Sequence, residues 1–117
     1  MPPTFLNADL HCHSVVSDGT LTPEEPAPRA AANGGELWSL TDDEEIGGQH
    51  RAIAAAHAGG MSYLTGAEIS VTFAGGTVHI VGLGFDPDNA ALREGLAETR
   101  DGRIPRARDM ADQLAKV

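Results

Sequence analysis

Three short apolar segments alternate with two helix-like segments along the first 65 residues of the chain. Residues 5–10, 37–40 and 61–65 are the apolar runs, and each leads into a polar cluster. Runs of this length predict strands, whereas the intervening segments, 22–33 and 48–57, carry helix start and stop signals. Strands that alternate with helices predict an α/β fold with parallel strands and covering helices, in which functional groups gather at the carboxyl ends of the strands.

The first of these helices carries conflicting proline signals. Thr22 fits the N-cap position, Pro23 the first helical position, and Glu25 the second partner of a capping box. Pro26 and Pro28 follow at positions where a helix begins to need backbone N–H donors. We therefore expect a helix that starts near Thr22 and has a strained or shortened first turn.

The second half of the chain predicts a β-hairpin followed by helices. Residues 70–73 and 77–81 flank an Ala-Gly-Gly turn sequence, and His79 lies on the returning strand. An Asp-Pro-Asp sequence then interrupts the chain before two helical segments, near residues 90–100 and from residue 104 to the C-terminus. The final stretch, from residue 106, has neither a stop signal nor a later element to pack against.

We expect residues 1–117 to be the N-terminal portion of a single larger domain. Residues 1–100 would hold the first strand–helix units and the hairpin, and residues 101–117 would begin a following helical segment. A sheet cut short has open edges and an uncovered apolar face, so we expect this portion to fold poorly by itself.

Composition and charge exclude some classes of function. Of the 117 residues, 41% are hydrophobic but only 4% are aromatic, so aliphatic side chains must fill the core. The formal charge of −9 argues against a broad basic face for duplex nucleic acid, although it does not exclude a nucleotide held through metal ions. Cys12 is the only cysteine, and no segment has the pattern of a membrane span or a secretion signal. We expect a cytoplasmic location.

His11 and His13 are candidate metal ligands. Residues two apart in an extended strand point to the same side, so both imidazoles can face one ion while Cys12 turns the other way. An isolated pair of this kind is more often two unrelated imidazoles. Asp9 before the pair and Asp18 after it favour a divalent-metal site instead.

Three further residues have both a functional and an ordinary explanation. Asp18 lies in Ser-Asp-Gly, where it could reach a metal ion or simply form a turn. Glu68 follows a predicted buried strand, which makes a solvated position less natural and favours a bridging carboxylate. His79 lies between apolar residues and by itself fits a hydrogen-bonded structural histidine.

Five motifs follow one another along the chain, and their order is more specific than any one of them. They are Asp-Leu-His-Cys-His-Ser at 9–14, Ser-Asp-Gly-Thr-Leu-Thr-Pro at 17–23, Leu-Thr-Asp-Asp-Glu-Glu-Ile-Gly-Gly at 40–48, Gly-Ala-Glu-Ile-Ser at 66–70 and His-Ile-Val-Gly-Leu-Gly at 79–84. Together they resemble the PHP (polymerase and histidinol phosphatase) metallohydrolases over nearly the whole chain. The resemblance is greatest to the stand-alone bacterial members, which hydrolyse nucleoside 3',5'-bisphosphates and trim short RNA from its 5' end.

The resemblance implies a distorted (β/α)7 barrel with up to three divalent metal ions, Mn, Zn, Fe or Mg, at the strand ends. It implies that His11 and His13 hold the first ion. Glu68 would bridge the first and second ions, His79 would help to hold the second, and Asp18 would belong to the third. This chain would supply only the first part of the barrel, because the family's later histidines and its late Asp-x-His motif have no counterpart in it.

Asp43 departs from the family's pattern. At this position, after Thr-Asp, the family has a histidine that binds the third metal ion. An anionic oxygen in place of a neutral nitrogen, at a site that already uses Asp18, leads us to expect a lost or weakened third ion. The alternatives are a harder ion, such as Mn or Mg, bound through Asp43, and a merely solvated Asp43 in the acidic run 42–45.

The expected activity is that of a phosphoesterase, in which metal ions activate a water molecule and neutralise phosphate oxygens. The substrate would be a small nucleotide or a short oligoribonucleotide. The sequence has no motif for a serine or cysteine nucleophile, and it assigns neither a catalytic residue nor an organic cofactor. The alternatives are a histidinol phosphatase, the PHP domain of a DNA polymerase, and a non-catalytic metal-binding fragment of such an enzyme.

Overall fold

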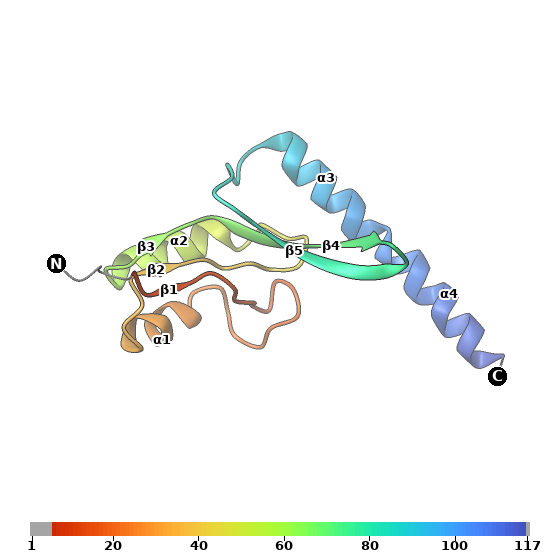
Figure 1. Ribbon diagram of the computed structural model, residues 1–117, viewed down its shortest axis with the longest axis horizontal. Coiled ribbons are helices and arrows are strands. Elements are labelled where there is room, and N and C mark those ends of the chain that lie inside the picture. Colours follow the sequence, from red (N-terminus) through yellow and green to blue (C-terminus); the bar gives the residue numbers. More distant parts are fainter. Residues whose placement is uncertain (1–5, 117) are drawn as a thin grey trace.

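The computed structural model describes residues 6–116, and its first half is a parallel sheet flanked by two helices (Figure 1). The strands β1 (Ala8–Asp9), β2 (Leu37–Trp38) and β3 (Ser62–Tyr63) lie in the order β1-β2-β3, and both pairings are parallel. The predicted α/β arrangement is therefore confirmed, although each strand is shorter than its apolar run. The first predicted strand began at residue 5, which lies outside the described residues.

The first helix begins later than the sequence suggested. Thr22 donates its backbone N–H to Glu25 Oε2 at 2.7 Å, so the predicted capping contact forms, but α1 runs only over Pro26–Ala32. The start near Thr22 was wrong because Pro26 and Pro28 would lie in that helix at positions that need a backbone N–H donor. The chain first makes a turn that ends at Glu25, and Pro26 then takes the first helical position, where its missing N–H costs nothing.

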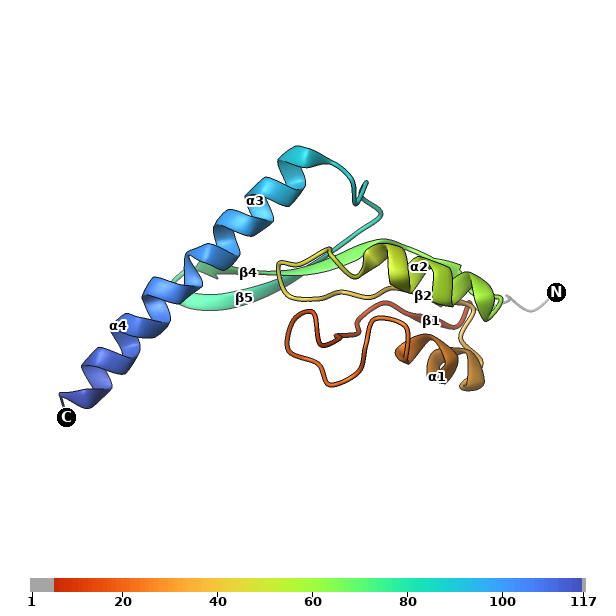
Figure 2. The ribbon, with the colours of Figure 1, turned by 180° about the vertical axis from the view of Figure 1, so that it is seen from behind.

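The two helices cover the sheet and close a small core. α2 (Gln49–Ala58) agrees with its prediction to within one residue at each end. It packs against α1 and β3, and Figures 1 and 2 show both helices beside the parallel strands. The buried core residues of this region come from both helices and from the segments around β2 and β3: Ala27, Trp38, Leu40, Ala52, Ala56 and Met61.

The second half begins with the predicted hairpin, which is confirmed but longer than expected. β4 (Gly66–Phe73) pairs antiparallel with β5 (Gly76–Leu83) along their whole length. The turn residues Ala74 and Gly75 both have positive φ, 51° and 80°, as a two-residue hairpin turn requires. Glu68 therefore lies within a hairpin strand rather than just after a parallel one.

The chain ends in two nearly collinear helices, α3 (Ala90–Asp101) and α4 (Arg103–Ala115), joined by Gly102 in helical conformation (Figure 1). Leu96 of α3 packs on Ile46 and Ala67 in a second small core. Apart from Arg103, which is half-buried, the described side chains of α4 are exposed. The helix predicted from residue 104 to the C-terminus corresponds to α4, which begins one residue earlier, and Val117 lies outside the described residues.

Two arginines at the junction of these helices tie them to the acidic run after β2. Arg100 donates to the Glu44 carbonyl oxygen and pairs with Glu45, and Arg103 forms an ion pair with the buried Glu44 carboxylate. No helix in the described part of the chain is long and apolar enough to cross a membrane.

Candidate metal centre

The candidate site is built where three segments lie side by side beyond the ends of the parallel strands. The segment after β1 carries His11 and His13, and the segment after β2 carries Asp43. Thr41 N–H donates to the Cys12 carbonyl at 2.7 Å, which joins these two segments. On the other side, Asp43 forms an isolated parallel bridge with Glu68 of β4. The carboxyl ends of the strands thus bring distant polar residues together, as parallel strands do.

His11, His13 and Glu68 form the first group of potential metal ligands, which we call the first donor group. His11 Nε2 lies 2.9 Å from Glu68 Oε1 and 3.2 Å from His13 Nε2, and His13 Nε2 lies 3.6 Å from Glu68 Oε2. The Glu68 side chain is 11% exposed whereas that of His11 is 59% exposed. The first donor group therefore has a buried carboxylate on one side and a solvent-exposed imidazole on the other.

His13, Asp18 and Asp43 form the second donor group. His13 Nδ1 lies 3.0 Å from Asp18 Oδ1 and 3.3 Å from Asp43 Oδ2. One imidazole thus belongs to both groups, with Nε2 facing the first and Nδ1 facing the second.

Two sequence candidates lie apart from these groups. His79 is exposed on β5, paired in register with Ser70, and its Nδ1 lies 2.8 Å from Ser70 Oγ. Asp9 is also exposed, and its carboxylate accepts only a long bond of 3.4 Å from His11 N–H. The structure therefore gathers five of the six predicted ligands, His11, His13, Asp18, Asp43 and Glu68, and leaves His79 outside.

Negative charge is concentrated at these groups. Burial, and after it the hydrogen bond with Glu68, raises the pKa of Asp43 to about 7. The same bond with Asp43 lowers the pKa of Glu68, so the carboxylates share protons in the absence of a cation. Three carboxylates and two imidazoles in one place offer the oxygen and nitrogen donors that divalent ions such as Zn, Mn or Fe accept. In each group the donor atoms lie within 4.8 Å of one another, so the residues fit a divalent ion.

Two supporting residues escaped sequence reasoning. Asp42 is 1% exposed and hydrogen-bonded to the turn after His13, although its place in an acidic run suggested a solvated carboxylate. Gln49 is fully buried at the start of α2 and joins the ends of β2, β3 and β4. The only sequence signal for Asp42 is its position next to the candidate ligand Asp43. No sequence pattern pointed to Gln49.

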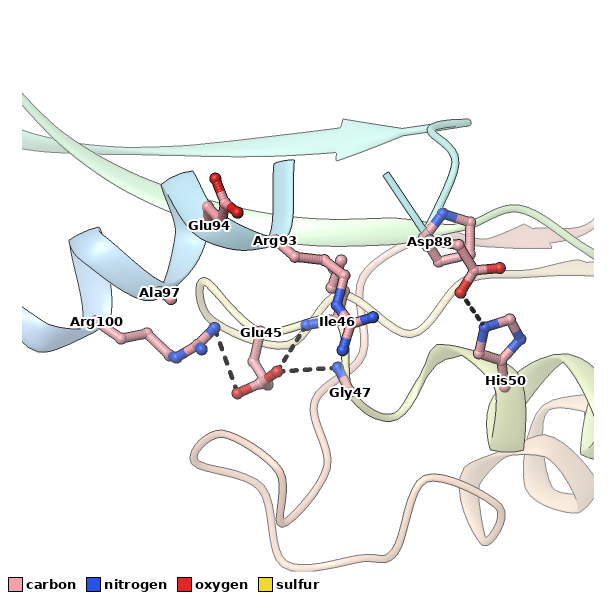
Figure 3. Close-up of a pocket in the computed structure, with 10 residues that line it drawn as sticks. Glu45, Ile46, Gly47, His50, Asp88, Arg93, Glu94, Ala97 and Arg100 are labelled. Atoms are coloured by element: carbon pink, nitrogen blue, oxygen red, sulfur yellow. Dashed lines mark hydrogen bonds and ion pairs between the residues drawn. The ribbon is translucent and has the colours of Figure 1, made fainter. Parts of the chain in front are cut away.

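A separate pocket of 350 Å³ lies between α3 and the segment that leads into α2 (Figure 3). Its charged side chains are mostly paired, because His50 contacts Asp88 at 2.8 Å and Arg100 contacts Glu45 at 3.4 Å. None of the six predicted ligands lines this pocket. It is therefore distinct from the two donor groups.

Comparison with known proteins gives clear relatives, although no family model matches the chain. The chain is 51% identical over 108 residues to a 3',5'-nucleoside bisphosphate phosphatase of Chromobacterium violaceum, covering 92% of this chain and 38% of that protein. It is 41% identical over 109 residues to a 5'-3' exoribonuclease of Haemophilus influenzae, covering 93% and 40%. The chain thus spans about two fifths of the length of these relatives.

The fold has a solved counterpart. A metal-dependent phosphoesterase from Bifidobacterium adolescentis superposes with a TM-score of 0.83 at 31% identity, covering 97% of this chain and 40% of that one. Sequence and structure therefore point to the same kind of protein.

Proposed function

We propose that the chain belongs to the PHP-type metal-dependent phosphoesterases and that the protein containing it releases phosphate from nucleoside 3',5'-bisphosphates. We propose further that residues 1–117 are the N-terminal portion of a single barrel domain, which later segments complete. The observation that carries the proposal is the pair of donor groups that share His13 at the strand ends.

In this proposal, the residues that would hold one divalent ion are those of the first donor group, His11, His13 and Glu68. The ion would supply positive charge that neutralises phosphate oxygens and makes a water molecule easier to deprotonate. Asp18 and Asp43 orient the His13 ring through Nδ1 and offer oxygen donors for a further ion. The first group suits Zn, Fe or Mn, whereas the oxygen-rich second group suits a harder ion such as Mn or Mg.

His79 stays a candidate ligand. It lies two residues along β5 from Val81, which pairs with Glu68, so its imidazole is on the strand that flanks the first donor group. Elements outside residues 1–117 would have to supply the remaining ligands of a complete multinuclear site.

A short oligoribonucleotide is the second candidate substrate, because one relative of the chain is a 5'-3' exoribonuclease. Both substrates present a phosphate ester that the same ions could hold. A cytoplasmic location is consistent with either substrate.

The test is phosphate release from a 3',5'-bisphosphonucleoside by the whole protein supplied with Mn²⁺. We expect release that a chelator abolishes, and a fall in kcat/KM on the order of 100-fold or more in Glu68→Gln. Glu94→Gln, at an exposed position on α3, is the matched control and should behave as wild type.

Each result bears on a different part of the proposal. A folded, metal-loaded wild type that releases no phosphate would contradict the substrate. Wild-type activity in Glu68→Gln would contradict the site. A fragment of residues 1–117 that matched the whole protein would contradict the need for later segments.

A further inference from the structure

Asp42 is a buried carboxylate whose side-chain hydrogen bonds all go to the turn that connects His13 to Asp18. Asp42 Oδ1 accepts from Ser14 N–H at 2.6 Å and from the Ser17 hydroxyl at 2.8 Å, and Oδ2 accepts from the Ser14 hydroxyl at 2.7 Å. Ser14 and Asp42 are at most 1% exposed. Three short bonds to one charge, out of contact with water, fix this turn strongly.

Ser17 connects this carboxylate to His13. A serine hydroxyl has one proton to donate, and Asp42 at 2.8 Å is a better acceptor than Asp18 Oδ1 at 3.4 Å. With its proton given to Asp42, the Ser17 oxygen presents lone pairs to His13 Nδ1, 3.3 Å away. Ser17 therefore acts as an acceptor toward the imidazole.

The Asp18 Oδ1 oxygen, 3.0 Å from His13 Nδ1, and the Ser17 oxygen are then both acceptors. Asp43 Oδ2 also lies near, at 3.3 Å. A neutral ring carries one N–H, and these partners place it on Nδ1. The lone pair of the ring is then on Nε2, which faces His11 and Glu68 in the first donor group.

We propose that Asp42 is a positioning residue for the metal centre, acting through Ser17 and Ser14. It holds the turn that carries His13 and Asp18, and it orients the Ser17 hydroxyl so that His13 keeps the tautomer whose Nε2 can bind an ion. This inference rests on the proposed function, because it assigns Asp42 a role at the same metal centre. Partners of ligating histidines commonly change metal affinity by about 10–100-fold when they are removed.

The test compares three variants of the whole, metal-stripped protein. Ser17→Ala removes the connecting hydroxyl, and Asp42→Asn keeps the shape of the side chain but weakens its accepting power. Ser39→Ala is the matched control, because Ser39 is fully buried on the same segment and its hydroxyl has no hydrogen-bond partner among the described residues. Circular dichroism establishes folding, calorimetric titration gives Mn²⁺ affinity, and nitrogen NMR of the His13 ring gives its tautomer.

We expect Ser17→Ala to lower the affinity for at least one Mn²⁺ ion by about tenfold and Asp42→Asn by about 10–100-fold, with less of the Nδ1–H tautomer in both. Ser39→Ala should keep the wild-type affinity and tautomer. If Asp42→Asn does not fold, Ser17→Ala decides alone.

Unchanged affinity and tautomer in the folded variants would overturn the inference, as would an equal loss in Ser39→Ala. A wild type that binds Mn²⁺ with this pattern of variants but releases no phosphate would contradict the proposed function and leave the inference standing. Normal phosphate release with unchanged affinities in Ser17→Ala and Asp42→Asn would overturn the inference alone.

Discussion

The parallel layer, residues 8–63, and the hairpin with its helices, residues 66–115, are built very differently. The layer buries Trp38 and Leu40 completely, whereas the second region exposes Ile80 at 50% and Leu114 at 73%. Four of the five gathered site residues come from the layer, and only Glu68 comes from the hairpin, at its buried base. The difference teaches that the donor groups depend on the region with the closed core.

Gln49 joins the ends of the strands in the layer through its side-chain hydrogen bonds. Its amide donates to the Leu40 and Gly66 carbonyls at 2.8 and 3.0 Å, and its oxygen accepts from the Tyr63 hydroxyl at 2.6 Å and from Gly66 N–H at 3.1 Å. A buried amide with all these groups satisfied holds the ends of β2 and β3 beside the start of β4. The hairpin starts at this point and extends away from the parallel strands.

The largest expected effect comes from breaking the core of the layer. Trp38→Ala should reduce the free energy of unfolding of the metal-free whole protein by about 3–5 kcal/mol, because it leaves a cavity beneath both helices. Urea unfolding followed by circular dichroism measures the loss. Met110→Ala on α4, 65% exposed, is the control and should change stability by less than about 0.5 kcal/mol. Equal losses would contradict the contrast between the two regions.

A smaller effect is expected from changing one donor on the layer. Asp43→His restores a nitrogen ligand beside His13 and Asp18, and should tighten binding of an ion at the second donor group by about tenfold, or increase the metal stoichiometry. Metal titration of the whole protein measures both, with Asp101→His at an exposed position as the control. Unchanged affinity, stoichiometry and turnover would mean that residue 43 is not a ligand.

Removal of the Asp43 charge should alter the pH dependence of stability in the metal-free protein. The folded-state pKa of about 7 lies above the ordinary value of 3.8, so the folded state binds the proton more tightly than the unfolded state does. Stability from this group is therefore full below about pH 4 and is lost as the pH rises through 7. Asp43→Asn should be more stable than wild type by about 1 kcal/mol at pH 8 and no more stable near pH 4. Unfolding curves at both pH values check this, and an equal difference at the two would contradict it.

The smallest effect is expected on the last helix. Leu114→Ser replaces a side chain that is 73% exposed, so the free energy of unfolding should change by less than about 0.5 kcal/mol. The measurement uses the whole protein. A loss above about 1 kcal/mol would mean that a later segment covers α4. The exposed second region would then be an internal interface of the whole protein, unlike the layer, which has its own core.

The sequence predicted the layer and the hairpin well because their signals are local. Apolar runs and glycine stops fix β2, α2 and the hairpin within a few residues, and parallel strands then require that the segment carrying His13 and the one carrying Asp43 lie close together. The start of α1 was harder to predict, since Pro23, Pro26 and Pro28 lie close together and each fits the first turn of a helix. The local sequence does not show that the helix begins at Pro26.

The rest depended on contacts that no local pattern records. His79 is on the predicted strand, but the distance of its imidazole from the first donor group depends on the course of an eight-residue hairpin. Asp42 and Asp43 are adjacent acids with different partners, because Asp42 accepts from Ser14 in the packed turn whereas Asp43 lies beside His13. Whether the six predicted residues bind metal stays a prediction that the experiments above test.

The helical Gly102 joins α3 and α4 into one continuous rod, and Arg100 and Arg103 near its middle contact the acidic run at Glu44 and Glu45. α4 continues for 13 residues past Gly102, a length of about 20 Å at about 1.5 Å per residue. A tilt of the rod by about 10° about Gly102 would therefore displace the C-terminal end of α4 by about 3–4 Å, so any segment that packs there fixes the angle of the rod far more strictly than a contact near Gly102 would.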